Sequence, residues 1–238
     1  MGIMNSSSSN RLLIICPSRL RPDRIKDMLK SFDETKSEGT DLVIYISECD
    51  PRLEEYKVSL EGRNYIVGKR IPVAHVYNYC FEKYPDYKYY GEVCDDHIYK
   101  TKGWDTIFID EIEKHGGWGM SWGTGLIHPV STVLPQAMVM SGNMVRALGY
   151  FTTPLLYAAW NDQFARELGE ALNCLYYRPD VIVEHVHVLN GKAPMDDNYK
   201  WTLSPEVQEI GRVQYNKWLT EEKQNDIDRI NKARSLNE

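Results

Sequence analysis

The sequence contains no run of about 18 apolar residues, the length that a transmembrane helix requires. Its five cysteines are odd in number and none of them forms a C-x-x-C pair. This usage is typical of reduced thiols and argues against a zinc ribbon. Residues 1–10 are rich in Ser and Asn and lack the apolar core of a signal peptide. We therefore expect a cytoplasmic protein with no membrane span.

Several nucleotide-binding and catalytic motifs are also absent. The sequence has neither a G-x-x-x-x-G-K-[ST] phosphate loop nor a G-x-G-x-x-G after a strand, which argues against P-loop enzymes and dinucleotide-dependent oxidoreductases. No G-x-S-x-G nucleophile elbow occurs either. With 28 Lys and Arg against 34 Asp and Glu, the chain lacks the basic excess that a broad nucleic-acid footprint needs. Basic residues do gather between Arg11 and Lys26, where they suit the phosphates of a small ligand.

The chain does have an ordinary globular composition, 42% hydrophobic, arranged as alternating strand and helix patterns. Short apolar runs predict strands that are buried on both faces, as in a parallel sheet. The predicted strands cover residues 12–16, 42–47, 64–67 and 87–93, and helical patterns separate them. This βαβ alternation predicts an α/β fold with a mostly parallel central sheet flanked by helices.

The pattern divides the chain into a flexible lead-in over residues 1–10, an α/β domain over 11–203 and a C-terminal helical extension over 204–238. The extension begins with Ser followed by Pro, which is typical of a helix start. After Thr220 the charged composition predicts a solvated helix or a frayed tail. The Gly- and Trp-rich stretch 116–125 is too flexible for a helix interior, and it is either a loop against a ligand or an irregular crossing.

Two adjacent carboxylates, Asp95 and Asp96, directly follow the strand predicted over residues 87–93. Ligands of α/β sheets bind at the carboxyl ends of the strands, and an aspartate pair there suits Mg²⁺ or Mn²⁺ bridging a diphosphate. A turn or a helix cap is the structural alternative. His185 and His187 lie two apart in a strand-like segment and should point to opposite faces. We expect His187, nearer the following loop, to complete a metal site begun by Asp96.

Asp162 stands at the start of a predicted helix. It either complements the helix dipole or acts as a general base that takes the proton from an acceptor hydroxyl. Arg19, Arg21 and Arg70 are candidate partners for a diphosphate, because the guanidinium group presents a fork of donors matched to phosphate oxygens. Surface salt bridges are the alternative for each arginine.

With these features in this order, the chain resembles the GT-A glycosyltransferases, in particular family 2-like members of phage and bacterial origin. The resemblance covers residues 12–199. It rests on the opening strand into Pro17-Ser18-Arg19, Asp50 after the second strand, Asn78 in the helix before the metal strand, Cys94-Asp95-Asp96 in the position of the D-x-D motif, the segment Met138 to Tyr150, Asn161-Asp162 and a late histidine.

The resemblance implies a nucleotide-diphospho-sugar transferase fold with a divalent metal, Mn²⁺ or Mg²⁺, and a nucleotide-diphosphate sugar donor, most simply a UDP-sugar. It assigns roles to the matching positions. Pro17, Ser18 and Arg19 would line the nucleotide pocket, Asp50 would lie near the nucleobase, and Arg70 and Asn78 would also bind the donor. Asp95 would contact the ribose or the metal, and Asp96 and His187 would hold the metal. Asp162 would be the general base of an inverting transfer. Because Cys94 replaces the first Asp of a strict D-x-D, either the motif shifts to residues 95–97 or one carboxylate binds the metal.

Two other functions remain open from the sequence. One is a nucleotidyltransferase of related fold, although its glycine-rich opening loop is absent after Cys16. The other is a non-catalytic module that binds nucleotide sugars or carbohydrates. The acidic charge ranks a glycan or small-molecule acceptor above a modified DNA base. Trp118, Trp122 and Trp160 either stack on sugar faces or belong to the core.

Overall fold

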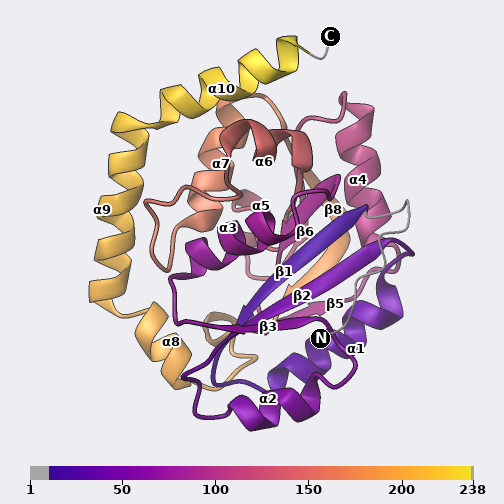
Figure 1. Cartoon of the computed structure of the whole chain (residues 1–238), viewed down its shortest axis with the longest axis vertical. Helices are drawn as coiled ribbons and strands as arrows, with labels where there is room; N and C mark the ends of the chain where they lie inside the picture. Colours follow the sequence, from indigo (N-terminus) through magenta and orange to yellow (C-terminus); the bar gives the residue numbers. More distant parts are fainter. Residues whose placement is uncertain (1–10, 237–238) are drawn as a thin grey trace.

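A computed structural model describes residues 11–236, in which strands and helices alternate (Figure 1). The strands are β1 (Leu12–Ser18), β2 (Thr40–Ser47), β3 (Tyr65–Gly68), β4 (Tyr89–Glu92), β5 (His97–Tyr99), β6 (Met120–Thr124), β7 (Val139–Ser141) and β8 (Leu175–His185). The helices are α1 (Arg24–Thr35), α2 (Leu53–Ser59), α3 (Val73–Lys83), α4 (Trp104–Lys114), α5 (Val130–Val133), α6 (Gly142–Leu148), α7 (Asn161–Ala171), α8 (Asp197–Thr202), α9 (Pro205–Glu221), α10 (Lys223–Ser235) and the short η1 (Val188–Asn190). Among these helices, none combines the length and apolarity needed to cross a membrane. The lead-in predicted over residues 1–10 lies outside the described residues.

The strands of the described chain form one sheet in the order β3-β2-β1-β4-β7-β6-β8-β5. Strands β3, β2, β1 and β4 run parallel to one another, and β6 runs parallel to β8. Strand β7 is antiparallel to both of its neighbours, and β5 is antiparallel to β8. The predicted mostly parallel α/β sheet is confirmed, with antiparallel pairings in its second half.

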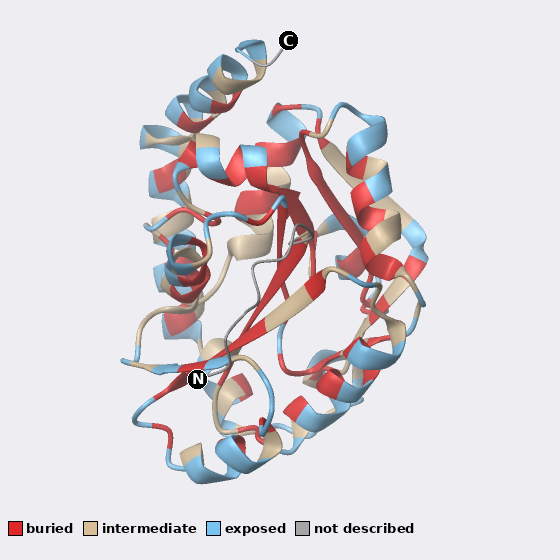
Figure 2. Ribbon diagram, turned by 45° about the vertical axis from the view of Figure 1, so that its right-hand side comes forward, coloured by how far each residue is buried: buried red, intermediate tan, exposed pale blue. Residues whose placement is uncertain are grey.

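The central strand β1 shows how the sheet divides the core into two layers. Leu13 and Ile15 pack into one hydrophobic cluster with side chains of α3, α6, α7, α9 and α10. Leu12, Ile14 and Cys16 pack into a second cluster with side chains of α1, α2 and α4. This split follows from the period of two along a strand. Figure 2 shows the result: buried strands run through the centre, and the exposed residues lie on the outer faces of the helices.

The Gly- and Trp-rich stretch 116–125 contains the buried strand β6, and is neither a ligand loop nor an irregular crossing. Trp118 and Trp122 are buried in the core, so they are not exposed for stacking on a sugar. Gly123 is required by the approach of β8, because a Cβ atom there would lie 2.3 Å from the carbonyl oxygen of Val181. A glycine inside a strand marks such a close backbone approach, which sequence composition alone does not distinguish from a loop.

The C-terminal helices share the core of the α/β part. Trp218 of α9 and Ile230 of α10 are fully buried in the cluster that contains Leu13. Asp226 of α10 is also fully buried, and it accepts hydrogen bonds from the Trp218 indole N–H at 2.8 Å and from the Tyr150 hydroxyl at 2.5 Å. The charged stretch after Thr220 is therefore a helix anchored by its buried face. The domain boundary between residues 203 and 204 stays a prediction.

We expect Asp226→Ala to lower the free energy of unfolding by about 2–5 kcal/mol, because the buried Trp218 indole and the half-buried Tyr150 hydroxyl lose their acceptor. Asp228→Ala, on the exposed side of the same helix, is the matched control and should change stability by about 0.5 kcal/mol or less. Urea denaturation of both variants measures the difference. Equal stabilities would show that Asp226 does not anchor α10.

Candidate functional site

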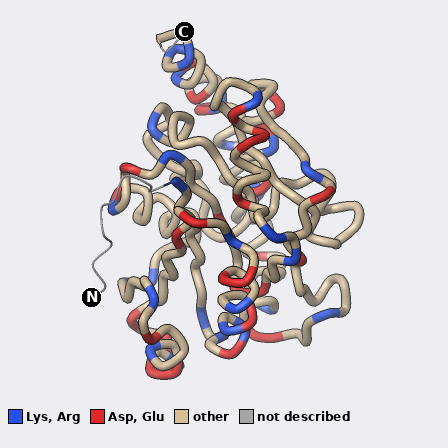
Figure 3. Tube along the Cα trace, turned by 90° about the vertical axis from the view of Figure 1, so that its right-hand side faces the viewer, with Lys and Arg blue, Asp and Glu red and all other residues tan. Residues whose placement is uncertain are grey.

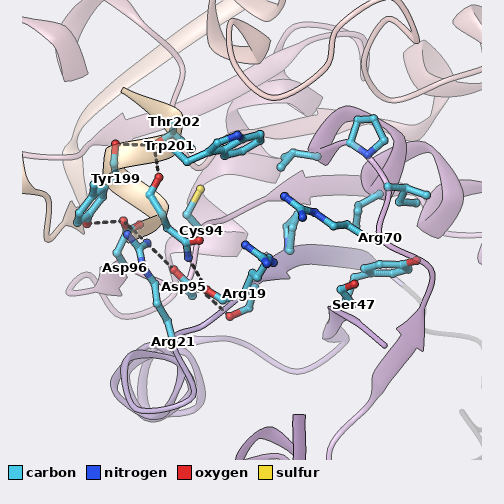
Figure 4. A pocket seen from close by; sticks show the side chains of 18 of the residues that line it. Arg19, Arg21, Ser47, Arg70, Cys94, Asp95, Asp96, Tyr199, Trp201 and Thr202 are labelled. Atoms are coloured by element: carbon cyan, nitrogen blue, oxygen red, sulfur yellow. Dashed lines mark hydrogen bonds and ion pairs between the residues drawn. The ribbon is translucent and has the colours of Figure 1, made fainter. Parts of the chain in front are cut away.

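A cavity of about 570 Å³ opens at the carboxyl ends of β1 and β2, beside the loop that follows β4 (Figure 4). This is the edge of an α/β sheet at which ligands bind. Of the residues predicted from the sequence, the wall contains Pro17, Ser18, Arg19, Arg70, Asp95, Asp96 and His187. The structure does not place Asp50, Asn78 or Asp162 on this wall.

Asp50 and Asn78 fix loops beside the cavity. The Asp50 carboxylate, buried after β2, accepts the backbone N–H of Leu20 at 2.8 Å and so holds the loop that follows β1. The Asn78 side chain accepts the backbone N–H groups of Phe151 at 2.9 Å and Thr152 at 3.1 Å, and donates to the Thr152 carbonyl at 2.8 Å. These polar atoms already bind backbone groups, so their placement favours a positioning role over direct contact with a donor.

The carboxylate pair at the end of β4 is bridged by a buried arginine. The Nη1 atom of Arg21 lies 3.0 Å from Asp95 Oδ1 and 3.2 Å from Asp96 Oδ2. The other oxygen of Asp95 accepts a hydrogen bond from the Ser18 hydroxyl at 2.6 Å. Burial raises the pKa of Asp95 to about 6, although Arg21 acts in the opposite direction. Arg21 therefore compensates much of the negative charge of this pair.

The compensation is incomplete. Arg21 also forms a two-pronged ion pair with Asp196, from Nε at 2.8 Å and from Nη2 at 2.9 Å, and Arg24 lies 3.9 Å from the same carboxylate. Three carboxylates, Asp95, Asp96 and Asp196, thus meet two guanidinium groups, which leaves one net negative charge in the cluster. A bound cation would balance that charge.

The same contacts hold helix α8 against the cavity. Asp196 caps α8 by accepting the backbone N–H of Tyr199 at 2.9 Å. The Tyr199 hydroxyl donates to Asp96 Oδ2 at 2.7 Å, and the Tyr199 ring lies under the Arg21 guanidinium, 4.1 Å from centroid to Cζ. Asn198 donates to the carbonyl of Arg19. The position of α8 is therefore set by the charged groups of the site.

Three histidines surround Asp96. His185 Nε2 lies 3.2 Å and His97 Nδ1 3.4 Å from Asp96 Oδ1, and the two rings stack with centroids 4.1 Å apart. Burial would raise the pKa of Asp96, but these imidazoles bring it well below its usual range. Burial also lowers the pKa of His187 to about 4, so this imidazole is neutral, the form that binds metals.

The expectation that His185 and His187 point to opposite faces is wrong. Strand β8 ends at His185, so the alternation of side chains stops there, and both histidines line the cavity with ring centroids 4.7 Å apart. Of these two histidines, His185 is the one in contact with Asp96. The predicted metal-binding role of His187 stays a prediction.

The residues around Asp96 fit a divalent cation. Asp96 Oδ1 is buried and has no hydrogen-bond partner of adequate geometry within residues 11–236. Cys94, Asp96 and His97 bring one ligand atom each within 4.8 Å of one another. Carboxylate oxygen together with imidazole nitrogen suits Mn²⁺, and oxygen suits Mg²⁺. The donor set is therefore compatible with the predicted metal.

The arginines on the cavity wall supply the opposite charge. Arg19 and Arg70 form no ion pair with any other residue in the described part of the chain, and Arg19 Nε is buried without a hydrogen-bond partner. Elsewhere, basic and acidic residues are interspersed along the trace (Figure 3). Unpaired guanidinium groups on a cavity wall are suited to phosphate oxygens.

Asp162 lies in the first turn of α7 and is not on the cavity wall. Burial raises its pKa, against hydrogen bonds from the Gln163 backbone and the Gln136 side chain that lower it. Gln136 Oε1 also lies 3.4 Å from Nδ1 of His185, which lines the cavity. Gln136 therefore connects the candidate base with the site, and a raised pKa suits a carboxylate that accepts a proton near neutral pH.

Sequence reasoning missed three residues of this cluster: Gln136, Asp196 and Tyr199. It included His97 only through the alternative that the D-x-D motif shifts to residues 95–97. Asp196 and Tyr199 come from a polar stretch without periodicity, and folding alone brings them to Arg21 and Asp96.

No family model matches the sequence, and neither does any curated protein. Several solved structures are similar. Glucosyl-3-phosphoglycerate synthase from Mycobacterium tuberculosis, with Mn²⁺, UDP-glucose and phosphoglyceric acid, is 9% identical with a TM-score of 0.61, covering 86% of this chain and 79% of that one. The mannosyltransferase PcManGT from Pyrobaculum calidifontis, with GDP-Man and Mn²⁺, is 12% identical with a TM-score of 0.57. The match covers 95% of this chain and 74% of that one. S. aureus TarS 1–349 is 12% identical with a TM-score of 0.54, and the match covers 94% of this chain and 78% of that one. The fold is therefore the predicted GT-A fold.

The last residue of β4, Glu92, is a buried acid beside this site. Burial raises its pKa to about 8, with a further rise from Asp162 and a smaller opposing effect from the Tyr77 hydroxyl. The folded protein therefore keeps a proton on Glu92 at neutral pH, whereas the unfolded chain loses it near pH 4.5.

Because the folded state binds the extra proton, Glu92 should reduce the free energy of unfolding by about 1.4 kcal/mol per pH unit as the pH rises between these two pKa values. Glu92→Gln should remove this slope, since the amide does not ionise. Urea denaturation from pH 5 to 8 measures the difference from the wild type, and Glu61→Gln at an exposed position is the control. If the Glu92→Gln and wild-type profiles run parallel, Glu92 is not protonated in the folded state.

Proposed function

We propose that the chain is a metal-dependent glycosyltransferase that moves a sugar from a nucleotide-diphosphate sugar onto an acceptor hydroxyl. One observation carries the proposal: two unpaired guanidinium groups, of Arg19 and Arg70, share a cavity wall with the carboxylate pair Asp95 and Asp96. The cavity lies at the strand ends where α/β sheets bind nucleotides. A diphosphate with a divalent cation is complementary to both sets of charges, because the phosphates suit the arginines and the cation suits the carboxylate cluster.

The donor site follows from the residues on this wall. Arg19 and Arg70, which line the cavity, would bind the diphosphate. Pro17 and Ser18 would border the nucleotide, and Asp95 would contact the ribose or the metal. Structures with this fold bind UDP, UDP-glucose, UDP-GlcNAc or GDP-Man. A uridine diphosphate sugar is therefore the first donor to test.

Asp96 would hold the cation, Mn²⁺ or Mg²⁺, together with His187 or His185. When bound there, the cation supplies charge neutralisation for the leaving nucleoside diphosphate. Arg21 keeps the Asp95 and Asp96 carboxylates in place by binding one oxygen of each. The remaining Asp96 oxygen, Oδ1, lies beside the imidazoles of His185 and His97 and would face the cation together with them.

Asp162 would take the proton from the acceptor hydroxyl as this attacks the anomeric carbon, which gives inversion of configuration. Its raised pKa and its link to His185 through Gln136 support this assignment.

Thermal unfolding tests the donor and the metal together. With Mn²⁺ present, a UDP-sugar at 100 times its dissociation constant should stabilise the protein by about 2.7 kcal/mol, and EDTA should abolish most of this effect. Asp96→Asn should behave like the EDTA sample, whereas Asp197→Asn, an exposed neighbour of the site, should behave like the wild type. Equal stabilisation with and without metal would refute the metal site. Stabilisation by free saccharides alone would favour a binding module.

Asp162→Asn should lower the rate of sugar transfer by on the order of 10²–10⁴ while leaving donor affinity unchanged, because the amide cannot accept the proton. Initial rates and donor titrations separate the two quantities. Glu170→Gln, on the exposed side of α7, is the control and should keep wild-type rates. An Asp162→Asn variant that transfers sugar as fast as the control would exclude Asp162 as the base.

A further inference from the structure

Two aromatic side chains on the cavity wall are exposed. Tyr157, in the loop between α6 and α7, is 40% exposed, and Trp201 of α8 is 37% exposed. Their ring centroids lie 6.1 Å apart with an interplanar angle of 64°. Neither ring belongs to the two hydrophobic clusters found among residues 11–236. The two rings therefore contribute little to the core. They meet at an angle and present an apolar surface to the cavity, and we call this pair, Tyr157 and Trp201, the aromatic corner.

Trp201 is unusual among the tryptophans of the chain. Trp104, Trp118, Trp122 and Trp218 are buried. Trp160 packs against Tyr215, with centroids 5.3 Å apart. Within residues 11–236, Trp201 is thus the most exposed tryptophan, while the others are buried or half-buried. An exposed aromatic residue inside a cavity gains its packing partner when a ligand binds.

Both rings stand on anchored segments. Helix α8, which carries Trp201, is held by the ion pair between Asp196 and Arg21. The loop that carries Tyr157 is tied to α3, where His75 Nε2 lies 3.0 Å from the Pro154 carbonyl. The corner is therefore formed before a ligand arrives, which reduces the ordering cost of binding.

The neighbours of the corner define the ligand chemistry. On the α8 side the wall presents the uncharged polar side chains of Asn198 and Thr202, together with the apolar start of α3. Figure 4 shows Trp201 and Thr202 across the cavity from Arg19 and Ser47. Arg21, which also lines the cavity, is already paired with Asp95, Asp96 and Asp196. The two rings therefore suit the apolar face of a ring, and the neighbouring amide and hydroxyl groups suit its hydroxyl groups.

We propose that Tyr157 and Trp201 form an acceptor subsite that stacks on a pyranose ring of a neutral glycan or glycoside. That the bound saccharide is the acceptor rests on the proposed glycosyltransferase function. The donor occupies the arginine side, so the acceptor enters from the aromatic side. The loop that carries Tyr157 continues directly into α7 and Asp162, the candidate base, so a sugar on this corner meets the segment that removes its proton.

The experiment uses the full chain labelled with 5-fluorotryptophan and follows the ¹⁹F resonance of Trp201, assigned with Trp201→Phe. The probes are N-acetylchitotriose, cellotriose and maltotriose as neutral saccharides, an octathymidylate as a single-stranded nucleic acid, and UDP with Mn²⁺ as the donor side. We expect at least one saccharide to shift the Trp201 resonance. Trp201→Ala and Tyr157→Ala should each weaken that saccharide about tenfold and change UDP affinity by less than about threefold.

Two controls separate stacking from a general loss of structure. Trp201→Phe should keep most of the saccharide affinity, because it preserves a flat ring. Tyr65→Ala removes a tyrosine that is 36% exposed on β3 and is not on the cavity wall, and it should leave both ligands unaffected.

Three results would overturn the proposal: no saccharide of the panel shifts the Trp201 resonance, only the octathymidylate shifts it, or the alanine variants weaken UDP and spare the saccharide. The last would assign the corner to the donor. If saccharides bind as expected but no nucleotide sugar stabilises the wild type, the saccharide subsite is supported and the transferase function fails, so the two failures are distinguishable.

Discussion

The candidate site depends on the burial of a single cation, Arg21. Its guanidinium group contacts Asp95 and Asp96 after β4 and Asp196 at the start of α8. Two buried carboxylates side by side would otherwise repel each other at a high cost in free energy, and a buried charge that loses its partner destabilises a fold strongly. Because one guanidinium group contacts all three carboxylates, the loop after β1, the loop after β4 and helix α8 hold their positions together. The shape of the cavity follows from this arrangement.

Local signals in the sequence predicted the parts of the molecule that local physics determines. Short apolar runs ending in polar residues located β1, β2 and β4, and the carboxyl ends of these parallel strands necessarily meet at one edge of the sheet. Arg19, Arg70, Asp95 and Asp96 do line one cavity there. The GT-A fold could be recognised for the same reason, since its motifs occur at strand ends in a fixed order.

The remaining features depend on contacts between segments far apart in the chain. The oxygens of Asp50 are taken up by backbone N–H groups, which no spacing reveals. The two histidines share one side of the cavity because β8 ends between them, and element boundaries are the least certain part of a pattern. Strand β6 resembled a loop because Gly123 is dictated by the neighbouring backbone of β8. In each case the tertiary environment overrides local composition.

The bidentate contact between Arg21 and Asp196 joins residues 175 positions apart. Contacts of such high sequence separation form late, because the entropy of closing the intervening loop must be overcome first. During synthesis, the loops that supply Arg21, Asp95 and Asp96 precede α8, and until α8 docks the cluster lacks one of its three anions and the cavity lacks a wall. The cavity wall is therefore complete only once helix α8 has docked on the loops that follow β1 and β4.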